Sequence, residues 1–161
     1  MPWPAAIIFQ DVDGVLNHDA TGGPLDPALL GNLGRLVKDA NAGLVISSAW
    51  RKSDAALEQL LRSLRHDAGV PLERILGVTP SLCRGVECRA EEIGAWLRAH
   101  PRLADSARWV ALDDQDIEAQ DPSLLKNHFL RTNAADGLTR RGALHAAELL
   151  LGAPVWRGGG G

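Results

Sequence analysis

The stretch IIFQDVDGVLN, residues 7–17, is an apolar run that leads into two carboxylates, Asp11 and Asp13. Alternate side chains of an extended chain share a side, so both carboxylates can face one small volume. Two acids this close repel each other unless a cation lies between them or each takes a different protonation role. Gly14 follows and lets the backbone turn sharply, so that its N–H can approach an anionic ligand. The stretch therefore predicts a strand that ends at a polar site.

Two simpler interpretations of the same residues compete with this one. An Asp-Gly pair after an apolar run is an ordinary turn signal. A calcium loop does not fit, because Leu16 and Gly22 occupy the sixth and twelfth positions counted from Asp11, where the EF-hand needs Gly and Glu. The residues further along the chain decide in favour of a site.

Length and charge narrow the class of protein. With 161 residues and 45% hydrophobic content, the chain predicts one domain over residues 1–157, followed by a flexible glycine tail at 158–161. The formal net charge of −3 argues against binding of nucleic acid through bulk charge. The apolar run at Ile7 is too short for a signal peptide or a membrane span, so we expect no membrane association and a cytoplasmic protein.

Short apolar runs alternate with longer helical patterns along the chain. The apolar runs predict strands at 5–10, 44–46, 75–78, 109–112 and 128–131; the helical patterns predict helices at 27–41, 54–66, 89–100 and from Thr139 to about 151. Asp26 is the expected N-cap of the first helix. Strands that alternate with helices in this way imply right-handed crossovers, and hence an α/β fold: a three-layer, Rossmann-like domain with a central, mainly parallel five-stranded sheet.

Three of these strands end in polar side chains. Asp11 follows the first strand, Ser47 and Ser48 follow the second, and Asp113 and Asp114 follow the fourth. Ligands of such sheets gather beyond the carboxyl ends of the strands. Loop residues chosen only for solvation would be scattered at both ends of the strands. The pattern therefore predicts one shared site at that edge.

Phosphoryl transfer is the chemistry that suits these groups. Mg²⁺ prefers oxygen ligands and commonly takes one or two carboxylates plus a substrate phosphate, which Asp11 and Asp113 would supply. A carboxylate can attack phosphorus to give an aspartyl phosphate, while a second one protonates the leaving oxygen and then activates water. The hydroxyl of Ser47 and a fixed cation would hold the phosphoryl oxygens.

Three segments of the chain resemble, in order and spacing, motifs of the haloacid dehalogenase (HAD) superfamily. Motif I is matched by Asp11-Val12-Asp13-Gly14-Val15, motif II by Ser47 after an apolar strand, and motif IV by Asp113-Asp114 after another. The finer pattern is similar to the small HAD domains associated with Swiss-army-knife RNA repair proteins. It comprises Ile46-Ser47-Ser48-Ala49-Trp50-Arg51, Arg89 with Glu92-Ile93, Trp109 through Asp114, and Gly137-Leu138-Thr139.

The resemblance implies a role for each matched residue. Asp11 would be the nucleophile, and Asp13 the general acid/base and, through its backbone carbonyl, a metal ligand. Ser47 would bind the phosphoryl group. Asp113 would be the acidic metal ligand of motif IV, with Asp114 beside it.

The superfamily also expects a lysine or arginine between motifs II and IV. Arg89 begins the helix after the third strand, so it should emerge at the catalytic edge, whereas Arg98 near the other end of that helix should not. Arg84 in the preceding loop and Lys126 after motif IV are competitors. For each of these cations the simpler interpretation is a solvated surface charge.

Members of the superfamily often carry a cap domain, and this chain leaves no room for one. Only the short segment 16–25 separates motif I from the next helix, which predicts an open site suited to a phosphate on the end of a macromolecule. Trp50 and Arg51, with Lys52, could stack a base and pair a backbone phosphate. Alternatively, Trp50 packs against the sheet and the cations face solvent. His18 in the short segment could touch substrate, although a lone loop histidine is usually solvated.

We therefore expect a capless, Mg²⁺-dependent phosphomonoesterase that acts on RNA or DNA ends or on nucleotides, with Gly14, Ser48, Trp50 and Arg51 near the substrate. The alternatives are a receiver-like module that accepts phosphate and a metal-dependent nuclease. The sequence leaves open the choice between 5′ and 3′ phosphates, the oligomeric state and the identity of any protein partner.

The two cysteines are Cys83 and Cys88. They lack the spacing of a zinc site, even with His100 and His128 as distant candidates. We expect two reduced thiols.

Overall fold

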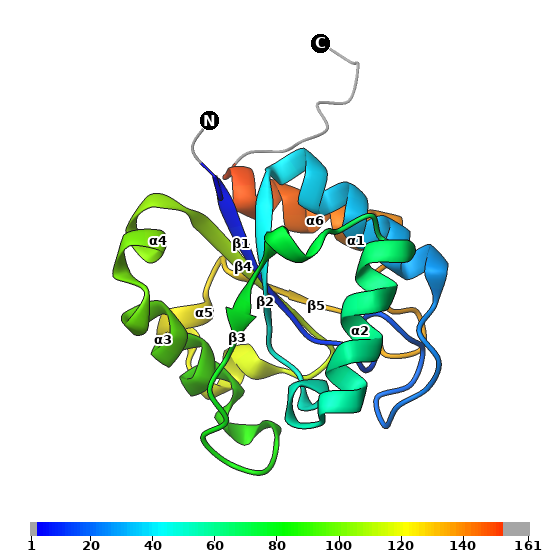
Figure 1. Cartoon of the computed structure of the whole chain (residues 1–161). Coiled ribbons are helices and arrows are strands. Elements are labelled where there is room, and N and C mark those ends of the chain that lie inside the picture. Colours follow the sequence, from blue (N-terminus) through cyan, green and yellow to red (C-terminus); the bar gives the residue numbers. More distant parts are fainter. Residues whose placement is uncertain (1–2, 153–161) are drawn as a thin grey trace.

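A computed structural model describes residues 3–152, and these form one parallel sheet covered by helices on both faces (Figure 1). The strands are β1 (Ala6–Gln10), β2 (Ala42–Ile46), β3 (Ile75–Val78), β4 (Arg108–Asp113) and β5 (Phe129–Arg131). The helices are α1 (Pro27–Ala40), α2 (Asp54–His66), α3 (Arg89–Ala99), α4 (Pro101–Ser106), α5 (Pro122–Leu125) and α6 (Arg140–Leu151).

The strand order is β3-β2-β1-β4-β5, and every neighbouring pair is parallel. The predicted α/β class and five-stranded sheet are confirmed, and the sheet is wholly rather than mainly parallel. Strand order reverses at β1, because β2 lies on one side of it and β4 on the other. In folds of this kind, the crevice beyond the carboxyl ends of such strands is where ligands bind.

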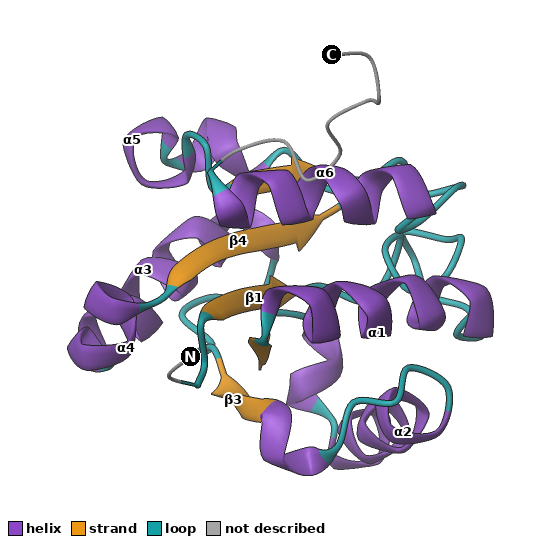
Figure 2. Cartoon of the chain, turned by 90° about the horizontal axis from the view of Figure 1, so that it is seen from above, coloured by secondary structure: helices purple, strands orange, loops and turns teal. Residues whose placement is uncertain are grey.

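Each face of the sheet has its own hydrophobic core. Helices α1, α2 and α6 cover one face, and α3, α4 and α5 cover the other (Figures 1 and 2). Residues of β1 alternate between the two: Ile8 packs in the first core, and Phe9 in the second. The ring of Phe9 meets Trp96 and Trp109 edge to face, with both pairs of ring centroids 5.5 Å apart. This burial on both sides fixes the direction of β1, and with it the position of the residues that follow.

The first and last helices begin at the N-cap residues that the sequence predicted. The side chain of Asp26 accepts a hydrogen bond from Ala28 N–H at the start of α1, and Thr139 accepts one from Gly142 N–H at the start of α6. The described residues contain no cap domain after motif I or after β3. None of the helices within residues 3–152 has the length and apolarity needed to cross a membrane. The predicted glycine tail and the domain end at 157 lie outside the described residues.

Candidate catalytic and metal site

Three carboxylates meet at the carboxyl edge of the sheet. Asp11 follows β1, Asp113 ends β4 and Asp114 comes next in the chain. Each offers an oxygen, and these oxygens lie within 4.8 Å of one another. All three residues are buried. Because β1 and β4 are hydrogen-bonded neighbours, the parallel register brings their ends together, as the sequence predicted.

Arg89 is the cation that reaches these acids. Its Nη1 donates to Asp113 Oδ2 at 2.8 Å and lies 3.2 Å from Asp11 Oδ1. The side chain is buried, and it comes from the first residue of α3. Arg84 and Lys126 are exposed, and within residues 3–152 neither side chain forms an ion pair with the cluster. Of the three competing cations, the structure brings Arg89 to the acids.

Burial governs the protonation of the cluster. It raises the pKa of Asp11 well above its usual value, and the charge of Asp113 raises it further, while Arg89 acts in the opposite direction. Burial likewise raises the pKa of Asp113 against the lowering effect of Arg89. One guanidinium therefore does not fully compensate the buried carboxylates. Their hard oxygen donors and uncompensated charge fit a divalent cation such as Mg²⁺.

Asp13 is not one of the three clustered carboxylates, but it lines the same small cavity as Asp11 and Asp114. Its Oδ1 accepts hydrogen bonds from Trp50 Nε1 and Asn17 Nδ2, both at 2.9 Å. The Trp50 ring is half-buried and packs against the core that contains Ile8, as one of the two alternatives predicted for it. The same alternative placed the neighbouring cations in solvent, which is wrong for Arg51, because its side chain is buried and paired with Glu92. The contact of Trp50 with Asp13 was not anticipated, and neither was the role of Asn17. Within residues 3–152, the second carboxylate oxygen of Asp13 has no hydrogen-bond partner.

Ser47 supplies a buried hydroxyl beside the acids. Its backbone N–H donates to Gln10 O at 2.8 Å, which ties the end of β2 to β1. Its Oγ has no hydrogen-bond partner among the described residues. Buried hydroxyls are normally paired, so this one is available to a ligand. Ser48 Oγ accepts the Trp50 N–H at 3.2 Å and caps the 3-10 turn Ala49–Lys52.

Arg51 finds its partners within the chain. Its guanidinium donates to Ser48 O at 2.6 Å, Thr79 O at 3.0 Å and Glu92 Oε2 at 2.8 Å. These bonds link the loop after β2 to the loop after β3 and to α3. Glu92 is buried; the sequence pattern included it beside Arg89 but gave it no role. A contact between Arg51 and substrate stays a prediction.

Gly14 is required by close packing. Its φ is +76°, and a Cβ at this position would lie 2.6 Å from Asp114 Oδ2. Its N–H, which we expected near an anionic ligand, donates to Asn17 Oδ1 at 2.8 Å. Its carbonyl accepts a hydrogen bond from Thr132 Oγ1 at 2.7 Å. The glycine thus lets the turn after β1 approach the end of β4.

The segment after motif I is attached to the rest of the domain through His18. Its Nδ1 lies 2.6 Å from Ala135 O, and its Nε2 lies 2.6 Å from Asp26 Oδ2. The hydrogen bond to Asp26 raises the pKa of His18, and the Ala135 carbonyl adds to the effect. Protonation therefore strengthens the attachment of this exposed segment.

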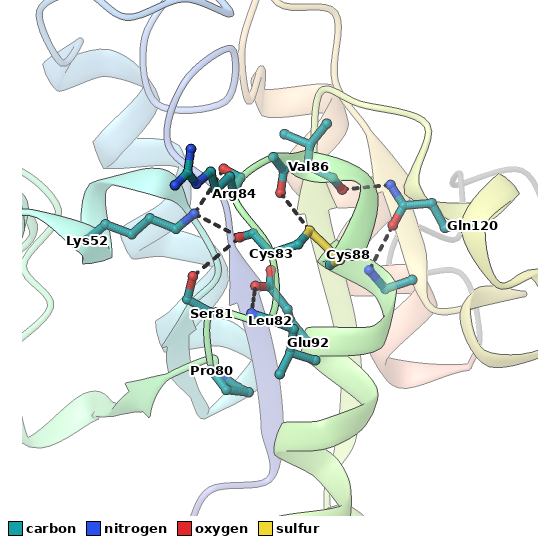
Figure 3. Close-up of a disulfide and its surroundings, with 12 residues drawn as sticks. Lys52, Pro80, Ser81, Leu82, Cys83, Arg84, Val86, Cys88, Glu92 and Gln120 are labelled. Atoms are coloured by element: carbon teal, nitrogen blue, oxygen red, sulfur yellow. Dashed lines mark hydrogen bonds between the residues drawn. A yellow bond between two sulfur atoms is a disulfide. The ribbon is translucent and has the colours of Figure 1, made fainter.

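The prediction of two reduced thiols is wrong: Cys83 and Cys88 form a disulfide (Figure 3). Their Cα atoms are 6.0 Å apart, within the range that a disulfide spans. Lys52 Nζ donates to the carbonyls of Cys83 and Arg84 at 3.2 and 3.1 Å, so the loop is folded back toward the turn after β2. The sequence spacing alone did not reveal this turn of the loop.

A small cavity opens among these groups. It has a volume of about 80 Å³, and its lining includes Asp11, Asp13, Ser48, Val86, Arg89 and Asp114. The disulfide-closed loop therefore contributes a wall through Val86. A larger hollow of about 640 Å³ lies between α1 and the segment 68–74, but it contains none of these groups. We place the candidate site at the smaller cavity because the reactive side chains converge there.

Residues 7–143 match the family model described as the HAD domain in Swiss Army Knife RNA repair proteins. No curated protein and no solved structure gives a significant match. The matched range contains every member of the acid cluster, Arg89 and Ser47.

Proposed function

Because the chain belongs to the family of HAD domains found in Swiss Army Knife RNA repair proteins, we propose that it is a Mg²⁺-dependent phosphomonoesterase that works through an aspartyl phosphate. The observation that carries the proposal is the convergence of Asp11, Arg89 and the unpaired Ser47 hydroxyl at one buried edge. A nucleophile, a cation and a hydroxyl are the groups this reaction needs.

Asp11, Asp113 and Asp114 would hold the metal ion through their side chains, with the Asp13 carbonyl as a further ligand. When bound, the ion offsets the negative charge of the acids and of the phosphoryl group. Arg89 then favours the ionised form of Asp11, which the attack on phosphorus requires.

The reaction proceeds in two steps. A carboxylate oxygen of Asp11 attacks phosphorus, the bond from phosphorus to the leaving oxygen breaks, and Asp13 gives that oxygen a proton. Asp13 then takes a proton from water, which attacks phosphorus and displaces Asp11 with release of inorganic phosphate. The Trp50 and Asn17 hydrogen bonds occupy Oδ1 of Asp13, so its proton is carried on Oδ2. Ser47 and Arg89 stabilise the phosphoryl oxygens in both steps.

The favoured substrate is a phosphate at a nucleic-acid end or on a nucleotide. The cavity of about 80 Å³ has room for little more than a phosphoryl group. The described residues provide no cap to enclose a small metabolite. The family match to RNA repair proteins supports the same choice.

Hydrolysis of an aryl phosphate with and without Mg²⁺ tests the proposal. Asp11→Asn should lower kcat/KM by about 10³-fold or more, since it removes the nucleophile. Asp105→Asn is the matched control, because Asp105 is an exposed acid on α4. Equal activity of wild type and Asp11→Asn, or activity that is unaffected by EDTA, would contradict the assignment. Stable retention of phosphate from a phosphodonor would instead indicate a receiver-like module, and cleavage of internal linkages a nuclease.

A further inference from the structure

A second and wider hollow adjoins the catalytic cavity at the carboxyl end of β5. It has a volume of about 510 Å³ and shares Ala20, Asp114 and Gln115 with the catalytic cavity. Its remaining lining comes from the segment 131–134. We call this hollow the β5 groove. A molecule bound in the catalytic cavity could extend directly into it.

The two volumes indicate what each space can hold. At about 80 Å³, the catalytic cavity is well below the size of most small-molecule sites. We therefore assign to it the phosphoryl group alone. The β5 groove, at about 510 Å³, lies in the usual range of ligand sites, about 300–1,000 Å³. The part of the substrate that bears the phosphate must lie outside the cavity, and the groove offers a space of the right size.

Arg131 gives the β5 groove a cation suited to a phosphate. The residue ends β5 and is exposed, and its Nε donates to Asp114 O at 3.0 Å. Its terminal nitrogens have no acceptor within residues 3–152. One hydrogen bond thus holds the guanidinium, while its other donors have no partner in the part of the chain that the structure describes. A planar guanidinium with two free nitrogens can bind a phosphate through two parallel hydrogen bonds.

Two side-chain amides add polar groups to the same groove. Asn133 Oδ1 accepts Ala135 N–H at 2.9 Å, which leaves its Nδ2 without a partner in the described chain. Gln115 Nε2 donates to Asp114 Oδ2 at 3.3 Å, and the Oε1 of Gln115 has no hydrogen-bond partner in the described chain. The groove therefore presents a donor and an acceptor as well as a cation. Sugar hydroxyls and base edges are partners of this chemistry.

We propose that the β5 groove binds the leaving portion of the substrate and that Arg131 there recognises a second phosphate. This phosphate belongs to the same nucleotide or to the linkage beside it. The inference rests on the proposed phosphatase activity and extends it from the reacting phosphate to a second anion. It makes Arg131 a specificity determinant, with no part in the chemical steps.

The test compares three substrates by kcat/KM: a nucleoside monophosphate, a nucleoside 3′,5′-bisphosphate and a dinucleotide with a terminal phosphate. In wild type a second phosphate should raise kcat/KM about tenfold, the effect of one charge-assisted contact at an exposed site. Arg131→Gln should abolish this preference, so that kcat/KM is the same with and without the second phosphate. Preference for the dinucleotide alone would identify a phosphodiester as the second anion, and preference for both would identify any second phosphate.

Arg84→Gln is the matched control. Arg84 is an exposed arginine of the disulfide loop (Figure 3). Through Val86 this loop forms a different wall of the catalytic cavity. It should keep the wild-type ratio. The inference is overturned if wild type shows no preference, if Arg131→Gln keeps the preference, or if Arg84→Gln loses it instead.

A binding measurement separates this inference from the proposed function. Anisotropy of a fluorescent, terminally phosphorylated dinucleotide is measured with its natural phosphodiester linkage and with an uncharged methylphosphonate linkage. Both ligands are titrated with Asp11→Asn and with the double variant Asp11→Asn, Arg131→Gln. If wild type hydrolyses none of the esters, the phosphatase proposal fails. The inference about the β5 groove is then still supported if the second phosphate strengthens binding about tenfold only when Arg131 is present. It is refuted if both dinucleotides bind with the same affinity.

Discussion

Replacing Arg89 by methionine should destabilise the metal-free protein by about 3 kcal/mol. The side chain is 6% exposed and its Nη1 contacts Asp113 at 2.8 Å and Asp11 at 3.2 Å. Removing one partner of a buried ion pair commonly costs about 3–5 kcal/mol, because the other charge stays buried. Here one of the acids can take up a proton, since burial already raises the pKa of Asp11. Protonation removes the uncompensated buried charge, so we expect a cost at the lower end of the range of about 3–5 kcal/mol.

Urea unfolding followed by tryptophan fluorescence measures this loss. With a slope of about 1–3 kcal/mol per molar urea, the midpoint in EDTA should fall by about 1–3 M. Mg²⁺ should narrow the gap between Arg89→Met and wild type, because the ion binds the folded acids and replaces the lost positive charge. Arg98→Met is the matched control, since Arg98 lies exposed in the last turn of the same helix, and it should change stability by about 0.5 kcal/mol or less.

The pH dependence has a definite sign. A raised pKa means that the folded state of an acid binds a proton more readily than the unfolded state, so the protein gains stability as pH falls from the folded pKa toward the ordinary 3.8. The deficit of Arg89→Met should therefore shrink on acidification. The reasoning is refuted if Arg89→Met and Arg98→Met unfold at the same urea concentration, or if the deficit is identical in Mg²⁺ and EDTA.

Three further outcomes follow from other contacts. Trp50→Phe removes the N–H that donates to Asp13, a hydrogen bond to a charged group worth about 1.5–3 kcal/mol. For alkyl phosphates kcat/KM should therefore fall about tenfold or more, and for aryl phosphates with good leaving groups it should fall less. An equal fall for both classes would contradict the role of Asp13 as acid. NMR titration should give His18 a pKa above 6.5, and in Asp26→Asn this pKa should return toward 6.5. The stability that the pair contributes should be present below pH 6.5 and lost as pH rises through the raised pKa. An unchanged titration in Asp26→Asn would show that Asp26 is not the cause. Cys88→Ser should speed hydrogen exchange of the backbone amides at 83–88 and leave the exchange of β1 unchanged. If the amides at 83–88 stay as protected as in wild type, hydrogen bonds such as those from Lys52 hold the loop without the disulfide.

Periodicity located the regular elements because burial dictated them. The predicted strand 75–78 and helix 54–66 agree with β3 and α2 at both ends. Helices α4 (Pro101–Ser106) and α5 (Pro122–Leu125) were missed, since each is too short to display a helical repeat. Pro101 and Pro122 stand in the first turns of these helices, where a proline is tolerated.

The acids of the site were predictable because a parallel sheet collects the carboxyl ends of its strands at one edge. Arg89 could be placed in the same way, from its position at the start of α3. The contacts of Trp50 with Asp13 and of Arg51 with Glu92 were not predictable, since they join residues 37 and 41 positions apart and depend on side-chain directions. The disulfide was missed for a similar reason: the loop conformation that joins its cysteines depends on distant donors such as Lys52.

The charges of the site imply an order of binding. The three clustered carboxylates and the one guanidinium of Arg89 carry a formal charge of −2 when all are ionised. A phosphoryl dianion brought into this buried space would be repelled by the acids, and low dielectric surroundings would strengthen the repulsion. A divalent cation held by the three acids would balance this charge, and Arg89 and Ser47 would then be available to the phosphoryl oxygens of the proposed substrate. If the proposed function is right, affinity for phosphate should therefore depend on prior saturation with the metal.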